Sequence, residues 1–230
     1  MTTLVAPQIA GSNPDKSPNI RARVVLVLGA WFLAVMTLGA AGAFAGPPGR
    51  PPIGIAVGVA APLLLFAALF RLSRSFRDFV LTLDLRLVAA IQAWRWAGLG
   101  FLSLYAYKVL PAIFALPAGL GDMAVGLVAP LIVLRLVREP DFAASAAFAR
   151  WNLFGILDLV VAVTIASISF RLATGAPGEI SVAPMALLPL LVIPGFLVPV
   201  FLMLHVTALL QNRQLRRRAR LPLQGPARAG

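Results

Sequence analysis

Six long apolar runs divide this chain of 230 residues, and they constrain its fold more than any other feature. Each run is long enough to cross a hydrocarbon layer of about 30 Å as a helix that rises about 1.5 Å per residue. A composition of 60% hydrophobic and only 12% charged residues excludes an ordinary soluble domain. We therefore expect an all-α polytopic membrane protein, a bundle of about six transmembrane helices. The expected spans are residues 24–45, 53–70, 96–114, 118–136, 151–170 and 184–210.

Positive charge is concentrated in every second gap between these runs. Of the 20 Lys and Arg residues, 17 precede the first run, fill the second and fourth gaps, or follow the last run. Because cytoplasmic loops of membrane proteins are enriched in Lys and Arg, this pattern places both termini in the cytoplasm. It also explains these 17 residues by topology and removes them from the search for a functional site. They are Lys16, Arg21, Arg23, Arg71, Arg74, Arg77, Arg86, Arg95, Arg135, Arg138, Arg150, Arg213, Arg216, Arg217, Arg218, Arg220 and Arg228.

The regions outside the transmembrane domain (residues 23–210) differ in composition. Residues 1–22 contain Pro and Gly with few large apolar groups, which predicts a disordered cytoplasmic tail. Residues 211–230 form a basic cytoplasmic tail, and its Arg cluster suits anionic lipid headgroups. Residues 71–94 mix Arg with Leu and Phe. Part of this segment alternates like a strand, but a lone strand cannot satisfy its backbone at a membrane, so we expect an interfacial or cytoplasmic helix.

The first run raises the question of processing. A basic stretch, an apolar run and then Ala-Phe-Ala-Gly at residues 43–46 match the outline of a cleavable signal. The run is longer than the usual apolar region of roughly 7–15 residues, which favours a retained anchor helix. Cleavage would leave five helices in the same orientation.

Composition argues against several functions. The net charge of +12 is spread over short loops and tails, so we do not expect nucleic-acid binding. A chain with no Cys and one His cannot build a zinc site of three or four nitrogen and sulfur ligands. We predict no catalytic residues, no metal and no cofactor, and an enzyme ranks third among the functions considered. The expected partner is the lipid bilayer, and a homo-oligomer or a partner subunit is compatible with the sequence.

Prolines shape two parts of the predicted bundle. The uncharged segment of residues 111–117 begins and ends with Pro, and we expect it to turn between the third and fourth spans. In the sixth span, Pro189, Pro194 and Pro199 each remove a backbone hydrogen bond and should kink the helix. A bent, packed helix is one interpretation. The other is a discontinuous helix whose freed carbonyls line a binding site.

Two ionisable residues lie near the outer ends of predicted spans. Counting from the ends of those spans, Lys108 lies about 9 Å deep and Asp122 about 6 Å deep on the same side. Opposite charges at similar depth on consecutive helices could neutralise each other as an outer charged pair. Alternatively, Lys108 reaches the interface along its own aliphatic stem, and Asp122 benefits from the positive end of its helix dipole.

Asp158 is the strongest candidate for a functional residue. It lies about 10 Å inside the membrane, and so short a side chain cannot reach the interface. His205 lies at about 8 Å from the same, cytoplasmic side, and Asn152 lies nearer the interface. A titratable pair at this depth can bind a proton or a polar substrate group. The alternative is that Asp158 is a packing residue hydrogen-bonded to another helix, and that His205 merely lies at the amphipathic end of its own helix.

Three segments resemble known sequences: residues 83–95, residues 116–122 and the segment Trp-Asn-Leu-Phe-Gly-Ile-Leu-Asp at residues 151–158. Together they resemble a group of uncharacterised bacterial polytopic membrane proteins over roughly residues 75–210. The resemblance implies a membrane protein of about six spans in the bacterial inner membrane. It implies no activity, substrate or cofactor.

Two functions follow as hypotheses. The first is a transporter of a small solute, ion or proton that uses Asp158 and His205, with Asn152 beside them. The second is a non-catalytic membrane subunit or scaffold whose polar residues serve helix packing.

Overall fold

The computed structural model describes residues 17–220 apart from residues 48, 51 and 52, and it gives only the backbone of residues 17–19 and 220. Its regular elements are all helical, which confirms the all-α fold class. The α-helices are α1 (Ser17–Ala40), α2 (Ile53–Leu72), α3 (Arg74–Leu81), α4 (Leu85–Ile91), α5 (Leu99–Ala106), α6 (Ala112–Arg138), α7 (Ala146–Leu172) and α8 (Val198–Arg220). The shorter segments are the 3₁₀ turns η1 (Gln92–Gly98), η2 (Phe142–Ala144) and η3 (Ala183–Ala186), and the π-helical turn η4 (Ile193–Leu197).

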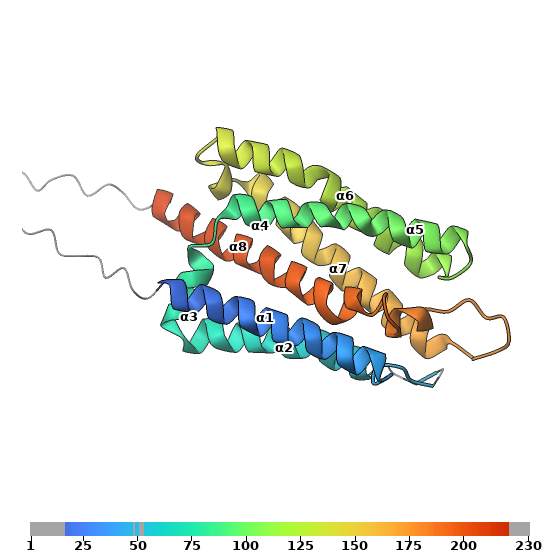
Figure 1. Ribbon diagram of the computed structural model, residues 1–230. Helices are drawn as coiled ribbons and strands as arrows, with labels where there is room; N and C mark the ends of the chain where they lie inside the picture. Colours follow the sequence, from blue (N-terminus) through green and yellow to red (C-terminus); the bar gives the residue numbers. More distant parts are fainter. Residues whose placement is uncertain (1–16, 48, 51–52, 221–230) are drawn as a thin grey trace, which may run out of the picture.

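Within the described residues, six helices are long and apolar enough to cross a membrane (Figure 1). This confirms the predicted polytopic bundle. The third span is assembled from α4, η1 and α5, which follow one another without a break, and the sixth from η4 and α8. The six spans are Ile20–Ala40, Ile53–Leu72, Leu85–Ala106, Ala112–Arg138, Ala146–Leu172 and Ile193–Ala219.

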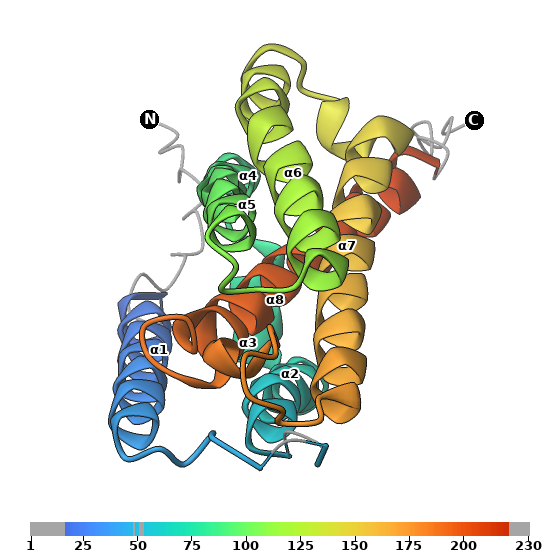
Figure 2. The same ribbon diagram turned by 90° about the vertical axis from the view of Figure 1, so that its right-hand side faces the viewer.

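Helix α8 occupies the centre of the bundle. Viewed along the helices, it is surrounded by α1, α2, α6, α7 and the α4–α5 segment (Figure 2). Half of the apolar stretch of the sixth span, to which α8 belongs, is buried inside the protein, whereas none of the corresponding stretch of α2 is. Because α8 has protein rather than lipid as its neighbour, a polar side chain on α8 can find a partner.

The third and fourth spans lie elsewhere than expected. The third span is Leu85–Ala106 instead of residues 96–114, and the fourth begins at Ala112 instead of residue 118. The chain reverses just before Ala112, so the proline-bounded segment of residues 111–117 does not form the turn. Most of this segment is the first part of α6, and Pro117 lies inside that helix.

The physical reason for this difference is ion pairing. Arg86 and Arg95 give the beginning of the third span the appearance of a charged loop. In the structure, Arg86 pairs with Asp84 at the end of the span at 3.0 Å, and Arg95 pairs with carboxylates inside the bundle. An arginine that is paired in this way can be accommodated in an otherwise apolar helix.

The sixth span is also displaced, from residues 184–210 to Ile193–Ala219. Pro189 precedes the helix and lies in the turns that follow η3, so it does not kink the span. Pro194 lies in the π-helical turn η4, and Pro199 lies at the junction of η4 and α8. The irregular backbone is therefore confined to the beginning of this span.

The two predicted tails are partly helical. Helix α1 begins at Ser17, and α8 continues to Arg220, so both reach into segments expected to lie outside the domain; residues 1–16 and 221–230 lie outside the described residues. Of the segment expected to form an interfacial helix (residues 71–94), only α3 stands apart from the spans. It lies where α1 begins and α8 ends, which we call the basic end of the bundle (Figure 1).

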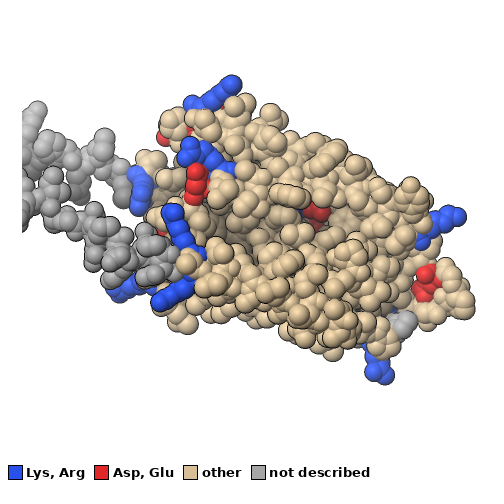
Figure 3. All heavy atoms as spheres, viewed as in Figure 1, with Lys and Arg blue, Asp and Glu red and all other residues tan. Residues whose placement is uncertain are grey.

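The charged side chains lie mainly at the two ends of the molecule. Lys and Arg atoms gather at the basic end, and a few lie at the opposite end (Figure 3). The band between the two ends is uncharged on this face except for a small acidic area. An uncharged band with charged ends is the surface expected of a membrane-spanning bundle.

Candidate functional site

A fully buried arginine lies at the centre of the polar interior. The Arg95 side chain is 0% exposed and comes from η1 in the third span. Its Nε donates to Oδ1 of Asp122 on α6 at 2.7 Å, and its Nη2 donates to Oδ2 of Asp158 on α7. Its Nη1 donates to the carbonyl oxygen of Gly155 on α7 at 3.3 Å. One guanidinium therefore links three of the spans.

His205 on α8 joins the sixth span to this arginine. The Nη1 atom of Arg95 lies 3.1 Å from Nε2 of His205. A guanidinium can only donate, so Nε2 accepts and the imidazole proton is on Nδ1. Nδ1 then donates to Oδ1 of Asn152 at 2.9 Å, and Nδ2 of Asn152 donates to the carbonyl oxygen of Phe148 at 2.9 Å. This chain of directed hydrogen bonds requires a neutral imidazole.

We call the five residues Arg95, Asp122, Asn152, Asp158 and His205 the Arg95 network. Its arginine, two carboxylates and histidine each lie within three residues of the midpoint of their spans. The network is therefore at the middle of the predicted membrane layer. No group of three or more His, Cys, Asp or Glu side chains suited to a metal ion occurs among the described residues.

The two carboxylates are more exposed than the arginine to which they are paired. The Asp122 side chain is 17% exposed and that of Asp158 is 8% exposed. Each uses one oxygen on Arg95. The other oxygens, Oδ2 of Asp122 and Oδ1 of Asp158, accept no hydrogen bond from any described residue. Each carboxylate therefore has one oxygen available to another ligand.

The charges of the network do not cancel when both carboxylates are ionised. Arg95 carries one positive charge, Asp122 and Asp158 carry one negative charge each, and the imidazole of His205 is neutral. One negative charge is left over in an apolar layer, where isolated charges are costly. A bound proton or a small cation would remove this excess.

Glycines make the close approach of these groups possible. A Cβ on Gly121 would overlap the Asp158 carboxylate, and a Cβ on Gly155 would overlap the His205 ring. A Cβ on Gly126 would overlap the backbone at Trp96, so η1 lies directly against α6. The small residues therefore determine how near Arg95 comes to its partners.

Aromatic rings enclose the rest of the site. The Arg95 guanidinium carbon lies 6.0 Å from the ring centre of Phe201, and the Trp151 and His205 rings meet edge to face at 5.6 Å. Gln92, one turn before Arg95, donates to the carbonyl oxygen of Phe201 at 3.4 Å. The Gln92 Oε1 and Trp151 Nε1 atoms are buried without a hydrogen-bond partner in the described residues.

The structure brings together Asp158, His205 and Asn152, the three residues of the predicted proton or substrate site. Asp158 and His205 do not bond each other. Each of them binds Arg95 instead. Asn152 contacts His205 directly. The carbonyl oxygens that accept hydrogen bonds at this site belong to Phe148, Gly155 and Phe201, so none of them is a carbonyl freed by a proline of the sixth span.

The predicted outer pair of Lys108 and Asp122 does not form. Lys108 lies exposed in the turn after α5, with a positive φ of 58°, and Asp122 pairs with Arg95. The displacement of the third span explains the difference: it places Lys108 beyond the end of the helix and Arg95 at the depth of Asp122.

Arg95 itself is absent from the predicted site because the distribution of basic residues predicts a cytoplasmic loop at this position. The sequence contains one signal that could have found it. The stretch before it, Leu-Arg-Leu-Val-Ala-Ala-Ile at residues 85–91, is apolar enough to belong to a span once Arg86 is paired with Asp84. Gln92 and Trp151 carry no comparable signal.

Comparisons with known proteins extend these observations. The model of a protein family described as a domain of unknown function (DUF8737) matches residues 52–212. No curated protein and no solved structure matches this chain. The matched segment includes all five residues of the Arg95 network and excludes α1. It covers well over half of the sequence, and the chain therefore belongs to the DUF8737 family.

Proposed function

We propose that this protein is a small membrane transporter in which the Arg95 network binds a proton or a small cation. The observation that carries the proposal is that two carboxylates, of Asp122 and Asp158, share one guanidinium within the apolar band. An uncompensated carboxylate near the centre of a bilayer costs about 2.5–3.5 kcal/mol on insertion scales. Uptake of one proton by either carboxylate removes that cost and leaves the network neutral.

Proton binding would change which helix Arg95 is paired with. When Asp158 on α7 is protonated, Asp122 on α6 remains the ionised partner of Arg95, and the reverse holds when Asp122 is protonated. The relative strength of the α6 and α7 contacts therefore depends on the site of protonation. A ligand that favours one of two arrangements is what a transport cycle needs to move between states.

His205 and Asn152 have a positioning role in this proposal. His205 accepts from Nη1 of Arg95 and is itself fixed by Asn152. These bonds keep the guanidinium in place from the α8 side while the carboxylates on α6 and α7 exchange a proton.

The test measures proton movement by the full-length protein in liposomes that contain a trapped pH-sensitive dye. We expect the wild type to dissipate an imposed pH gradient faster than empty liposomes, and Asp158→Asn and Asp122→Asn to lose most of this flux. Asp78→Asn is the matched control, because Asp78 is an exposed residue of α3 with no ion pair in the described chain. Infrared difference spectra should show the carbonyl band of a protonated carboxylic acid that disappears in one of the two network variants.

Folding of each variant is checked by circular dichroism and thermal melting in detergent. Unchanged flux in folded Asp158→Asn and Asp122→Asn proteins would contradict the proposal. Flux that falls equally in Asp78→Asn would contradict it as well, because the effect would then not belong to the network.

A second candidate is a non-catalytic membrane subunit, in which the network serves helix packing. The observation that favours it is that no residue of the Arg95 network lines the cavity of about 370 Å³ between α1, α2, α3 and α8. This cavity therefore gives a solute no direct route to the network. This function predicts stable co-purification with another membrane protein. It also predicts that Asp158→Asn lowers thermal stability or assembly although the wild type moves no protons.

We propose a location in the inner membrane of a bacterium, as the resemblance in sequence implies, and the distribution of basic residues supports an orientation with the basic end in the cytoplasm. The exposed Arg213, Arg216, Arg217 and Arg218 at the end of α8 would then face the anionic headgroups of the inner leaflet.

A further inference from the structure

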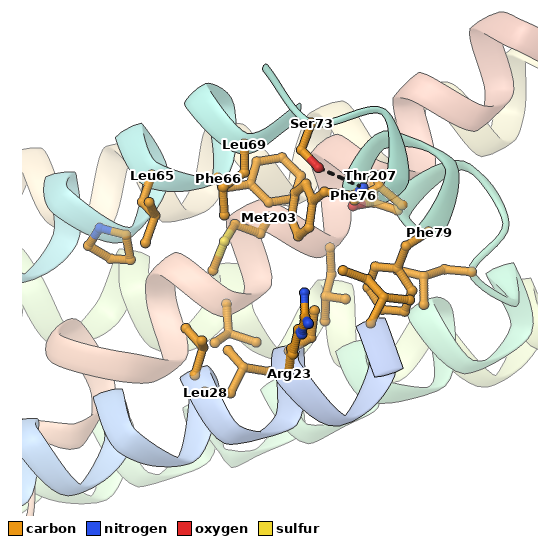
Figure 4. A pocket seen from close by; sticks show the side chains of 18 of the residues that line it. Arg23, Leu28, Leu65, Phe66, Leu69, Ser73, Phe76, Phe79, Met203 and Thr207 are labelled. Carbon is orange, nitrogen blue, oxygen red and sulfur yellow. Dashed lines mark hydrogen bonds between the residues drawn. The ribbon is translucent and has the colours of Figure 1, made fainter. Parts of the chain in front are cut away.

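An apolar cavity lies on the side of α8 away from the Arg95 network. It has a volume of about 370 Å³, is lined by residues of α1, α2, α3 and α8, and is partly open to the surface (Figure 4). Its walls are mainly Leu, Val and Phe side chains, among them Leu28, Leu65, Phe66 and Phe76. Small-molecule sites in proteins have volumes of about 300–1,000 Å³, so the cavity can hold a sizeable apolar group.

One basic side chain enters this apolar space. Arg23 lies in the first turns of α1 and points from that helix toward the cavity wall formed by α3 and α8 (Figure 4). Among the described residues it has no ion pair and no hydrogen bond, whereas Arg77 on α3 donates to the carbonyl oxygens of Phe70 and Arg71. The positive charge of Arg23 is therefore available to an anion at the basic end.

A buried hydroxyl group faces the same space. Thr207 on α8 lines the cavity and is only 2% exposed, yet no described residue accepts or donates a hydrogen bond at its side chain. The other nearby hydroxyl, of Ser73, already accepts from the backbone N–H of Phe76 as the N-cap of α3. Thr207 is thus a free donor for an oxygen atom of a ligand.

We propose that this cavity holds one acyl chain of an anionic phospholipid from the leaflet at the basic end, with the headgroup phosphate bound by Arg23. The apolar walls match the chain, and Thr207 can donate to an ester oxygen. The positive guanidinium favours a headgroup whose phosphate charge is not already compensated by a cationic group of the lipid itself. Helix α1 supplies Arg23 and closes one side of the cavity. Since α1 lies outside the family match at residues 52–212, the site depends on a part of this chain that the family does not define.

Trp31 makes the proposal testable because its ring lines the cavity. An acyl chain that carries bromine quenches tryptophan fluorescence on contact. Full-length protein is reconstituted into phosphatidylcholine vesicles with increasing amounts of brominated phosphatidylglycerol or brominated phosphatidylcholine. The Trp31→Phe variant gives the quenching of the other tryptophans, so that the contribution of Trp31 is obtained by difference.

We expect phosphatidylglycerol to quench Trp31 at about a fivefold lower fraction than phosphatidylcholine, as one basic residue near a membrane surface would produce. Arg23→Gln should abolish this preference. Arg21→Gln is the matched control, since Arg21 is also exposed and on the same helix but does not line the cavity, and it should retain the preference.

Equal quenching by the two lipids would overturn the proposal. So would an equal loss of preference in Arg23→Gln and Arg21→Gln, because the lipid would then respond to net charge alone. Thr207→Val should weaken the quenching by phosphatidylglycerol, and an unchanged value would remove the hydroxyl from the site. None of these results depends on proton flux, so the lipid site and the proposed function can fail separately.

Discussion

The guanidinium of Arg95 binds four acceptors because its N–H groups point in fixed directions within one plane. The acceptors lie on three helices, and the nearest of them in sequence, Asp122, is 27 residues away. Each acceptor fits only because the helix backbone beside it lacks a side chain. Glycine positions around the network should therefore be far less tolerant of substitution than glycines elsewhere in the same helices.

Gly121→Ala provides a prediction at this scale. The new Cβ would overlap the Asp158 carboxylate, so α6 and α7 would have to separate and the ion pair with Arg95 would weaken. We expect a loss of about 1–3 kcal/mol in the free energy of unfolding in detergent, the usual cost of an overfilled interior. Gly100→Ala is the control, because a Cβ at Gly100 meets nothing within 4 Å; it should be neutral or slightly stabilising. Equal melting temperatures for the two variants would contradict the packing described here.

The residues of the network could be predicted only in part. Asp158 and His205 stand out in sequence because each interrupts an apolar run, and the depth of each could be counted from the nearest boundary. Arg95 could not be recognised in this way, since Arg is also the residue that marks cytoplasmic loops. Its partners lie 27 to 110 residues away, and no local spacing reveals contacts of that range.

At the scale of elements, the third span shows where reasoning from hydropathy fails. Its mean hydropathy is 1.2, the lowest of the six spans, because it contains Arg86 and Arg95. A hydropathy scale assigns each charged residue the cost of an unpaired charge, whereas ion pairing within the protein lowers the cost of placing that residue in a membrane span. Hydropathy therefore predicts an interfacial segment for the first part of the span and displaces the helix boundaries that follow.

The start of this span supplies a prediction about pH. Asp84 is the N-cap of α4 and accepts from the backbone N–H of Arg86, whose side chain also bonds the carboxylate. These bonds, the side-chain bond first, lower the pKa of Asp84 from its usual 3.8. A lowered pKa means that the ionised carboxylate stabilises the fold at neutral pH and that this contribution is lost as the pH falls below 3.8.

We therefore expect Asp84→Asn to be less stable than the wild type at pH 7 and equal to it in acid. Asn is also a good N-cap, so the substitution removes the charge while retaining the cap. The Asp84 and Arg86 side chains are 49% and 58% exposed, and solvent screening should limit the difference to about 0.2–1 kcal/mol. Thermal melting in detergent at a series of pH values measures it. A difference in stability between the two proteins that persists below the pKa of Asp84 would show that the charge of Asp84 is not the cause of the difference.

At the scale of the whole molecule, the sequence predicts the number of spans well because length and apolar content decide whether a helix can cross a bilayer. It does not predict that α8 is central, since that depends on which faces of the helices fit together. The central position of α8 gives two of its side chains different surroundings. His205 contacts Arg95 of the network, whereas Thr207 lines the apolar cavity.

The orientation of the bundle is the remaining prediction, and the absence of cysteine makes it simple to measure. Asp141→Cys places one thiol in the exposed loop between α6 and α7 at the basic end, and Ala176→Cys places one in the exposed loop after α7 at the opposite end. If basic loops remain in the cytoplasm, a membrane-impermeant maleimide added to intact bacteria should label only Ala176→Cys. Both variants should react after lysis, which controls for access to the thiol. Labelling of Asp141→Cys alone in intact cells would show that the bundle has the reverse orientation, with Arg23 at the outer leaflet.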